Sequence, residues 1–549
     1  MTTAATLVET PSVLELAPGV ELHTGADTER ARRVLTDDAV ALIAELHRQL
    51  DGERRRLLAE RVERAAAWDA GEVPTYFDRT SEAAAGEWRV APVPADLQRR
   101  RVEITGPVND AKMVIKMLSR NEHGDRADAA MVDFEDSMKP SWINVIDGVL
   151  NVIGVAKHDL THVKPAAGGK PERRYALDPA DMAKLLVRVR GLHLAEANLT
   201  VDGDPVSGGL LDFALVLFHT GRILAARGET PAFYVPKVEH PEEARWWNQL
   251  FTVAQRAVGL EVGTLRATFL METLPAAFAM EEILYEIREH AAGLNVGRWD
   301  KIFSDIKVLK NHPDRVLADR ASISLNRPWM RDYAARLIEI CHRRGAYAIG
   351  GMAAFTPGKT ADLRQHQTSK VLEDKKLEFE LGHDGCWVSH PYFIGPALSA
   401  FPKDNQLEVR LGDDARYPEL LPEGGGPRTL GGLRTNVRVG IAYLEGWRRD
   451  LGCVAWDGLM EDLATLEISR AQVWQWLKHG VELDDGTPVT LQLVETIFAE
   501  ELARIHAEIT EGGGGQDLVD RFTAASAEAQ SIFLESEFRP FLTSISELA

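Results

Sequence analysis

The sequence predicts an α/β protein built on a (β/α)8 barrel, and three observations support this fold class. Short apolar runs alternate with amphipathic helical segments through the middle of the chain, which is the pattern of parallel strands joined by helices. A charged helical segment precedes these runs, and helical stretches follow them after a glycine-rich linker. The chain has 549 residues, 45% of them hydrophobic, and this length predicts about two to four structural units. We expect three, over residues 1–98, 99–420 and 421–549.

The predicted elements follow in chain order. The first hundred residues read as helices, of which 37–64 is amphipathic with one solvated face. Eight apolar runs predict the barrel strands, at 102–105, 129–134, 185–190, 232–238, 267–271, 293–297, 346–350 and 386–389. Helices are predicted between most of these runs, including 110–118, 210–226, 275–290 and 329–343.

Two polar segments rich in glycine and proline interrupt this alternation. Residues 164–174 predict an exposed loop, and residues 421–432 predict a linker between domains. Four helical stretches follow the linker, near 434–450, 459–479, 489–509 and 516–548. The C-terminal unit is therefore expected to be all-helical.

Composition excludes several classes of protein. A formal net charge of -20 argues against sequence-independent nucleic-acid binding, and a polyanionic substrate would need a local basic patch. The three cysteines lack CxxC spacing, so neither a zinc site nor a disulfide framework is indicated. No stretch approaches the length of a membrane helix, and residues 1–18 lack a signal-peptide pattern. We expect a cytoplasmic protein without nucleic-acid or membrane partners, in an oligomeric state that these features leave open.

Candidate chemistry lies where the predicted strands end, because functional groups of such a barrel gather at the carboxyl ends of its strands. These ends carry Glu135-Asp136-Ser137, Arg188 and Arg190, Lys237, Glu272 and Asp300. Glu272 and Asp300 end successive runs, and carboxylate oxygens are what Mg²⁺ prefers. The residues alone equally allow an ion-pair network that only orders the loops.

A second acidic cluster lies in the C-terminal part of the chain. In 458–470, GLMEDLATLEISR, Glu461 and Asp462 precede an apolar helical face. Acids are favoured at this end of a helix by its dipole. On the residues alone, Asp462 is therefore best interpreted as a helix-start acid.

Eight segments, in this order, resemble the malate synthase family, and specifically its shorter isoform, the A type. They are RRVEITGPV (100–108), DFEDSMKPSW (133–142), VRVRG (187–191), METLPAAFAMEEI (271–283), REHAAGLNVGRWDKIF (288–303), GGMAAFTP (350–357), HDGCWVSHP (383–391) and GLMEDLATLEISR (458–470). The resemblance covers about residues 74–479. It implies a TIM barrel with an N-terminal helical clasp and a C-terminal helical plug that carries the catalytic base.

The resemblance also implies an activity and the residues that perform it. The family condenses acetyl-CoA with glyoxylate in a Mg²⁺-dependent reaction of the glyoxylate cycle, and hydrolyses the malyl thioester to malate and CoA. Glu272 and Asp300 match the metal ligands, Arg188 the arginine that stabilises the enolate, and Asp462 the base. The positions implied for glyoxylate are Arg188, Glu272, Gly297, Arg298, Trp299 and Asp300, and those for acetyl-CoA are Ser137 and Pro357.

Two positions depart from the family pattern, and two alternatives stay open. Lys301 stands where tyrosine is usual, and Ala455-Trp456-Asp457 replaces a run beginning with proline. Asp457 would raise the basicity of Asp462 if the two lie close. A malyl-CoA or citramalyl-CoA lyase shares the barrel but lacks the helical tail. A non-catalytic CoA-binding barrel would not need acids at 272, 300 and 462 together.

Overall fold

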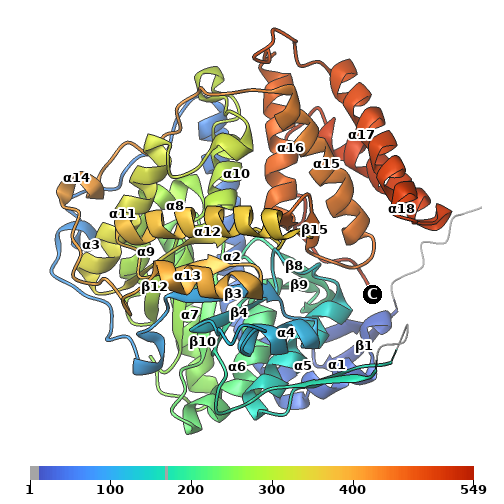
Figure 1. The fold of residues 1–549 in the computed structure, drawn as a ribbon. Helices are drawn as coiled ribbons and strands as arrows, with labels where there is room; N and C mark the ends of the chain where they lie inside the picture. The colour runs from blue at the N-terminus through green and yellow to red at the C-terminus, as the bar shows by residue number, and fades with distance from the viewer. Residues whose placement is uncertain (1–11, 167–170) are drawn as a thin grey trace, which may run out of the picture.

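Eight parallel strands close into a barrel at the centre of the computed structural model, which describes residues 12–166 and 171–549 (Figure 1). The strands are β3 (Val102–Pro107), β4 (Ala129–Asp133), β7 (Lys184–Arg188), β10 (Ala232–Val235), β11 (Arg266–Leu270), β12 (Ala291–Asn295), β13 (Tyr347–Ala353) and β14 (Gly385–Val388). They neighbour one another in chain order, and β14 closes on β3 with Cys386 opposite Val102. All eight predicted runs form barrel strands, and the predicted fold class is confirmed.

Residues 1–11 and 167–170 lie outside the described residues. Residues 1–11 are the start of the predicted clasp, and they belong to the stretch 1–18 that lacks a signal-peptide pattern. The second segment lies in the predicted polar loop at 164–174.

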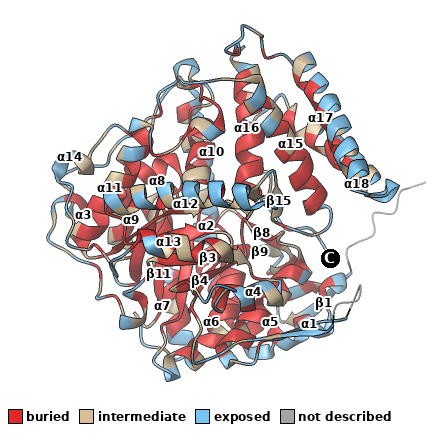
Figure 2. Cartoon of the chain, in the orientation of Figure 1, coloured by how far each residue is buried: buried red, intermediate tan, exposed pale blue. Residues whose placement is uncertain are grey.

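Helices surround the barrel, and their inner faces are buried together with the strands (Figure 2). They are α4 (Ala111–Leu118), α5 (Trp142–Lys157), α6 (Gly208–Ala226), α7 (Pro241–Ala257), α10 (Arg298–Val308), α11 (Pro328–Arg344), α12 (Ala361–Leu381) and α13 (Ile394–Ala400). The short helix α14 (Asp413–Arg416) has no buried residue and packs against α11. The single helix predicted over 275–290 is instead two, α8 (Leu274–Phe278) and α9 (Met280–Glu286). The backbone leaves helical geometry between them, at Ala279 (φ -107°, ψ 14°).

Helix α6 is long and apolar enough to cross a membrane by length and composition, contrary to the expectation that no stretch is. Most of its apolar surface is buried within the protein, where it packs against α2 (Asp37–Asp69) and α5. Burial of this kind is what a core helix shows.

The N-terminal part contains two strands as well as the predicted helices. Helices α1 (Glu29–Val34), α2 and α3 (Glu82–Ala85) are preceded by β1 (Val13–Ala17) and β2 (Val20–His23). Leucine and valine alternate with glutamate in this stretch, and Gly19 turns the chain with φ +74°, which is a hairpin pattern. The hairpin joins β8 (Ala195–Val201) and β9 (Asp204–Ser207) in a four-stranded sheet. The prediction of helices throughout residues 1–100 is wrong for this segment.

The predicted loop at 164–174 is also partly extended. Strands β5 (Thr161–Lys164) and β6 (Arg173–Ala176) pair antiparallel at its two ends. Alternation of polar and apolar residues over so few positions carried too weak a signal to distinguish a hairpin from a loop.

The C-terminal part packs around its own apolar cluster. Its helices are α15 (Leu430–Trp447), α16 (Leu463–Lys478), α17 (Leu491–Glu511) and α18 (Gln516–Phe533), and α16 packs against α10 of the barrel (Figure 1). A hairpin of β15 (Val454–Trp456) and β16 (Leu459–Glu461) precedes α16, so the part is not helical throughout.

The last predicted helix, at 516–548, ends early, at Phe533. Pro540 cannot continue a helix, and the tail beyond it returns to the barrel side of the molecule. There the Ala195 N–H donates to the carbonyl of Ser544 (3.0 Å), and the Ser546 hydroxyl donates to Glu196 (2.6 Å). The tail therefore ties the C-terminal part to β8.

Candidate active site

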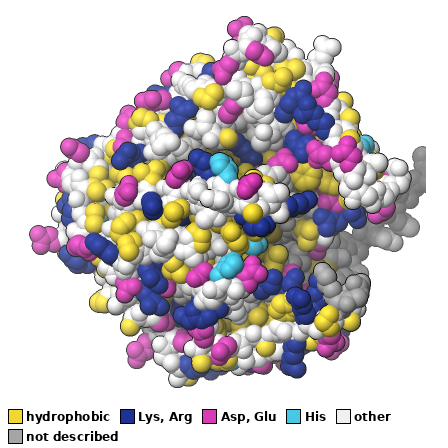
Figure 3. Space-filling model, viewed as in Figure 1, with side chains coloured by type: hydrophobic (Ala, Val, Ile, Leu, Met, Phe, Trp, Pro, Cys, Tyr) yellow, Lys and Arg dark blue, Asp and Glu magenta, His cyan; other side chains and the backbone are white. Residues whose placement is uncertain are grey.

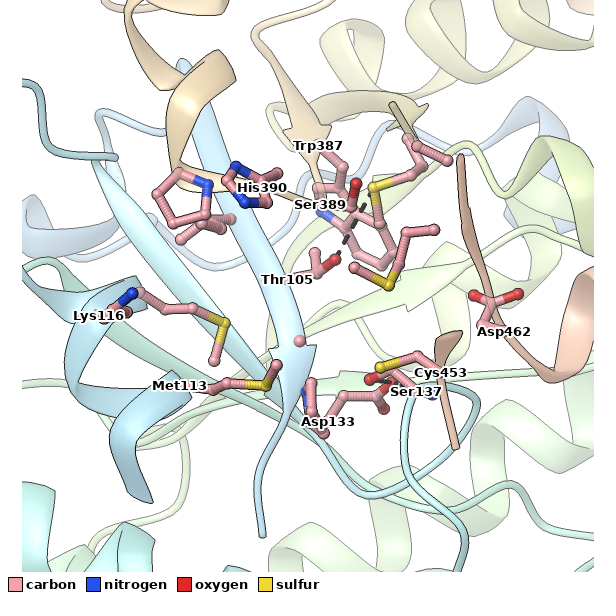
Figure 4. A pocket seen from close by; sticks show the side chains of 18 of the residues that line it. Thr105, Met113, Lys116, Asp133, Ser137, Trp387, Ser389, His390, Cys453 and Asp462 are labelled. Carbon is pink, nitrogen blue, oxygen red and sulfur yellow. Dashed lines mark hydrogen bonds between the residues drawn. The ribbon is translucent and has the colours of Figure 1, made fainter. Parts of the chain in front are cut away.

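A cavity of about 1100 Å³ opens at the carboxyl ends of the barrel strands. Figure 4 shows it from close by, with Asp462, Cys453 and Ser137 at one side and Lys116 and His390 at the other. All nine residues implied for the site line this cavity: Ser137, Arg188, Glu272, Gly297, Arg298, Trp299, Asp300, Pro357 and Asp462. The structure therefore brings together residues that span more than three hundred positions of the chain.

Glu272 and Asp300 lie at adjacent strand ends. Glu272 directly follows β11 and is fully buried, and its Oε1 accepts a hydrogen bond from the backbone N–H of Lys237 (2.8 Å). Asp300 lies in the first turn of α10, after β12. Burial and the charge of Asp300 raise the pKa of Glu272, and burial raises the pKa of Asp300 to about 6. Both shifts show that these carboxylates lack enough positive charge nearby to offset their burial.

These carboxylates fit a hard divalent cation. Among the described residues, Glu272 Oε2 is buried yet accepts no hydrogen bond, and Asp300 Oδ1 has the Lys237 ammonium at 3.2 Å, which Glu135 and Asp136 share. A buried anion is costly unless its charge is balanced. Carboxylate oxygens at such a place suit Mg²⁺. Glu272 and Asp300 are thus the residues that would hold the ion.

Another acidic group lies outside the cavity. His47 and Asp51 of α2 and Asp204 of β9 have side-chain atoms close enough together to hold a metal ion. Arg55 contacts both carboxylates, at 3.1 Å from Asp51 and 2.8 Å from Asp204. Arg55 thus already balances both carboxylates of this cluster.

The turn from Gly297 to Asp300 packs directly on Glu272. A Cβ atom at Gly297 would lie 2.5 Å from the Cβ of Glu272, so only glycine allows this approach. The Gly297 N–H lies 3.2 Å from the Tyr333 hydroxyl, which itself donates to the carbonyl of Met271. The Asp300 carboxylate is therefore held beside Glu272 by backbone packing.

Arg298 is paired away from the middle of the cavity, although it lies at its wall. Its guanidinium donates two hydrogen bonds to Asp374 of α12 (2.7 and 2.9 Å) and one to the carbonyl of Met352 (2.7 Å). This side chain holds the turn against α12. Trp299, beside it, lines the cavity and has the guanidinium of Arg320 over its ring at 5.6 Å.

Arg188 ends β7 with its guanidinium at the cavity floor. Two of its nitrogens donate to Asp133 in a bidentate pair (2.7 and 2.6 Å). Its third nitrogen, Nη1, lies 3.6 Å from both Glu135 and Asp136. Ser137 donates its hydroxyl to the same Asp133 (2.6 Å), so this predicted acetyl-CoA contact also orients the partner of Arg188.

The sequence pattern predicts Lys237 at a strand end but assigns it no role. It adopts the left-handed conformation, φ 52°, which is uncommon for a lysine. Its buried ammonium lies 2.7 Å from Asp136, 3.0 Å from Glu135 and 3.2 Å from Asp300. Local sequence gives no signal for this conformation, which long-range contacts enforce.

One of these contacts comes from the N-terminal part of the chain. Arg61 of α2 donates to the carbonyl of Lys237 (2.8 Å) and pairs with Glu243 (2.7 and 2.6 Å). Helix α2 therefore contacts Lys237, the residue whose ammonium lies among the carboxylates of the site.

Asp462 reaches the cavity from the C-terminal part. It is the N-cap of α16: its Oδ1 accepts from the Thr465 N–H (3.2 Å), and its own N–H donates to the Thr465 hydroxyl (2.9 Å). The interpretation as a helix-start acid therefore holds, and the same carboxylate also lines the cavity. Burial and the charges of Asp136 and Asp300 raise the pKa of Asp462 well above its usual value, which makes it a stronger base.

The two departures from the family pattern lie away from this chemistry. Asp457, in the turn between β15 and β16, pairs with Arg438 (2.9 and 3.2 Å) and is half exposed. The acidic residues that raise the pKa of Asp462 are Asp136 and Asp300. The expected effect of Asp457 on the basicity of Asp462 is therefore not found. Lys301 is buried behind the turn, paired with Asp305 and set over the rings of Trp329 and Tyr333.

Basic side chains also line the cavity. Lys112, Lys116, Arg120, Arg174 and Arg364 contribute to its lining, and Lys116 lies across the cavity from Asp462 (Figure 4). Elsewhere on this face, basic and acidic side chains are intermixed (Figure 3). The cavity is thus lined by both carboxylates and basic side chains, and Pro357 lines its wall.

Comparison with known proteins gives matches along nearly the whole chain. Models for "Malate synthase, N-terminal domain", "Malate synthase, TIM barrel domain" and "Malate synthase, C-terminal" match residues 23–82, 184–416 and 427–547. Malate synthase A of Escherichia coli (strain K12) is 42% identical over 522 residues, which cover 94% of this chain and 95% of that protein. The malate synthase of Myxococcus xanthus (strain DK1622) is 45% identical over 526 residues, 93% of each chain. A solved structure of the Haloferax volcanii malate synthase in a pyruvate/acetyl-CoA ternary complex aligns with 77% of this chain and 98% of its own, at 16% identity and a TM-score of 0.47.

Proposed function

Because this chain belongs to the malate synthase family, and is an acyltransferase of its A type, we propose that the cavity joins the acetyl group of acetyl-CoA to glyoxylate. One observation carries this assignment: Asp462 lines the same cavity as Arg188, Glu272 and Asp300, although it comes from a different part of the chain. The lyase and the non-catalytic barrel are not favoured, because relatives named malate synthase match more than nine-tenths of the chain.

Each of these residues has a different role in the condensation. Asp462 removes a proton from the acetyl methyl group as general base. Arg188 stabilises the enolate oxygen that results, since a fixed cation in a water-poor site stabilises developing negative charge. Glu272 and Asp300 would hold Mg²⁺, which when bound would polarise the aldehyde of glyoxylate. The turn from Gly297 to Asp300 positions the glyoxylate.

The basic side chains of the cavity fit the phosphates of CoA. Lys112, Lys116, Arg174 and Arg364 offer both strong point charges and planar guanidinium groups, which bind phosphate well, whereas Arg120 is paired with Asp181. This is the local basic patch that an acidic protein needs for a polyanionic substrate. Ser137 and Pro357 would then flank the acyl-carrying arm between the phosphates and Asp462.

The domain limits and the compartment are proposed on the same basis. We place the clasp, barrel and base-carrying domain at 1–98, 99–420 and 421–549. We propose a cytoplasmic location, which the free thiols of the three cysteines support.

A thiol-release assay tests the proposed function. Purified protein, acetyl-CoA, glyoxylate and Mg²⁺ should release one thiol for each malate formed. Omission of glyoxylate should stop the release. Thiol release without malate would contradict the proposal, because it would show a thioesterase.

Removal of the metal should abolish this activity and lower stability. Excess chelator leaves the buried oxygens of Glu272 and Asp300 without a divalent cation, so turnover should fall to background and return with added Mg²⁺. Mg²⁺ at about 100 times its Kd should stabilise the fold by about 2.7 kcal/mol, measured by thermal unfolding with and without the ion. Asp300→Asn should lose most of this stabilisation, and full activity in chelator would contradict the metal centre.

Release of Arg298 from α12 should weaken glyoxylate binding. Asp374→Asn removes the charge that holds the guanidinium, so the turn at Gly297 loses one of its supports. We expect the KM for glyoxylate to rise by about tenfold, on the scale of a charged hydrogen bond, with a smaller change in kcat and none in the KM for acetyl-CoA. Glu373→Gln, at an exposed neighbouring position, is the matched control and should change neither constant.

A further inference from the structure

One carboxylate of the cavity has no role in the condensation. Asp136 lines the cavity, is 1% exposed, and its Oδ1 accepts no hydrogen bond from the described residues. Its other oxygen accepts from the Lys237 ammonium (2.7 Å). A buried carboxylate oxygen without a donor is costly, and such a group at a cavity wall is expected to serve the reaction.

Asp136 lies between the two residues that handle the acetyl group. Its Oδ2, the oxygen that Lys237 holds, is 3.6 Å from Arg188 Nη1, and its backbone carbonyl accepts from the N–H of Leu463, the residue after Asp462 (3.2 Å). The carbonyl oxygen that Arg188 stabilises in the enolate is also the oxygen that becomes negative when water attacks the malyl thioester. The attacking water must therefore approach a carbon whose oxygen is already placed at Arg188.

Asp462 is less well placed to activate this water. It holds the methyl proton after enolisation, and its Oδ1 caps α16. Glu135 touches the same ammonium (3.0 Å) and is as buried as Asp136, but it is not among the described residues that line the cavity. Asp136 is the carboxylate that combines a free oxygen, a place at the cavity wall and contact with Arg188.

We propose that Asp136 is the general base of the hydrolytic half-reaction, and this inference rests on the proposed function. The Oδ1 of Asp136 accepts one proton of water while the water oxygen forms a bond to the thioester carbon. The electron pair of the carbonyl bond moves to the carbonyl oxygen, which lies beside Arg188. This electron pair then re-forms the carbonyl bond, the carbon–sulfur bond breaks, and the sulfur leaves as thiolate. The thiolate takes up the proton from Asp136, so malate and CoA are formed and the carboxylate is regenerated. Lys237 is a positioning residue that holds the opposite oxygen.

The test separates the two half-reactions in Asp136→Asn. Acetyl-CoA, glyoxylate and Mg²⁺ are mixed with the variant, the reaction is quenched in acid, and the malyl thioester is measured by mass spectrometry. Exchange of the acetyl methyl protons in deuterated solvent reports enolisation separately. Hydrolysis of added malyl-CoA should fall by about 10²- to 10⁴-fold, the range of general-base catalysis, and malyl thioester should accumulate. Exchange should slow by about tenfold at most, because the loss of one neighbouring negative charge lowers the pKa of Asp462 and weakens it as a base.

Glu135→Gln is the matched control, because it removes one charge from the same cluster and the same ammonium without reaching the cavity. It should accumulate no malyl thioester. Thermal unfolding, and Mg²⁺ affinity by calorimetry, show whether either variant has lost its fold or its metal site. If the parent protein forms no malate, the proposed function fails. If the parent is active and Asp136→Asn loses exchange and hydrolysis in equal proportion, without malyl thioester, Asp136 only tunes Asp462 and the inference is overturned.

Discussion

Asp462→Asn should stop the exchange of acetyl methyl protons with deuterated solvent, and malate formation with it. Removal of a general base costs about 10²- to 10⁴-fold in rate. The pKa of Asp462 is raised by burial and by Asp136 and Asp300, so this carboxylate is a stronger base than a solvated one. The loss should therefore lie toward the upper part of that range.

The substitution is expected to leave the fold intact. Asparagine caps a helix about as well as aspartate, so the hydrogen bond from the Thr465 N–H to the side chain should persist. The variant should bind acetyl-CoA and glyoxylate, measured by calorimetry, and unfold at nearly the parent temperature. A low rate in a destabilised protein would not count as loss of the base.

Asp457→Asn is the matched control for this experiment. Asp457 lies five positions earlier on the same segment, half exposed and paired with Arg438. Its substitution should leave exchange and turnover at the parent rate. Parent-rate exchange in Asp462→Asn would show that another group removes the proton and that Asp462 serves only as a helix cap.

Arg188→Lys should lose about 2.7–4 kcal/mol of transition-state stabilisation, the cost of removing one donor from a comparable oxyanion site. Lysine keeps the positive charge but not the planar fork. The guanidinium makes two kinds of contact at once. Two of its nitrogens bind Asp133, and Nη1 faces Asp136 and the cavity. An ammonium group cannot do both, so kcat should fall about 10²- to 10³-fold with a smaller change in KM.

Stability must be measured alongside activity in this variant. Arg188 is the buried partner of Asp133, and breaking a buried pair by removal of one partner costs about 3–5 kcal/mol. Arg190→Lys is the matched control, because Arg190 is equally buried but pairs with Asp212 and Glu196. It should lose stability in urea unfolding while it keeps most of its kcat. An unchanged kcat in Arg188→Lys would remove Arg188 from the proposed chemistry.

Three parts of the chain meet at the cavity, and each contributes different side chains to it. The barrel carries Arg188, Glu272 and Asp300 at its strand ends. Helix α2 holds Lys237 through Arg61, and the C-terminal part brings Asp462 over the opening. The base and the metal ligands therefore come together only when the C-terminal part is packed on the barrel.

The barrel could be predicted from the sequence because its signal is local. Each strand is buried on both faces, so it reads as an unbroken apolar run, and all eight were found. The hairpins β1–β2, β5–β6 and β15–β16 were missed, because short half-exposed strands carry little hydrophobic periodicity. The end of α18 was missed because the tail is held by contacts with β8, far earlier in the chain.

The fold class, the family resemblance and the residue types at the strand ends can be predicted from the amino-acid order, since these depend on burial pattern and on short local motifs. The pairing of these residues depends on the three-dimensional arrangement of the chain. This arrangement placed Lys237 in a left-handed conformation among three carboxylates, tied Arg298 to Asp374, and left one oxygen of Asp136 without a donor. The reason is physical: charge balance and hydrogen bonding in a buried site depend on distances between side chains that lie far apart in the sequence, and a one-dimensional pattern contains no such distances.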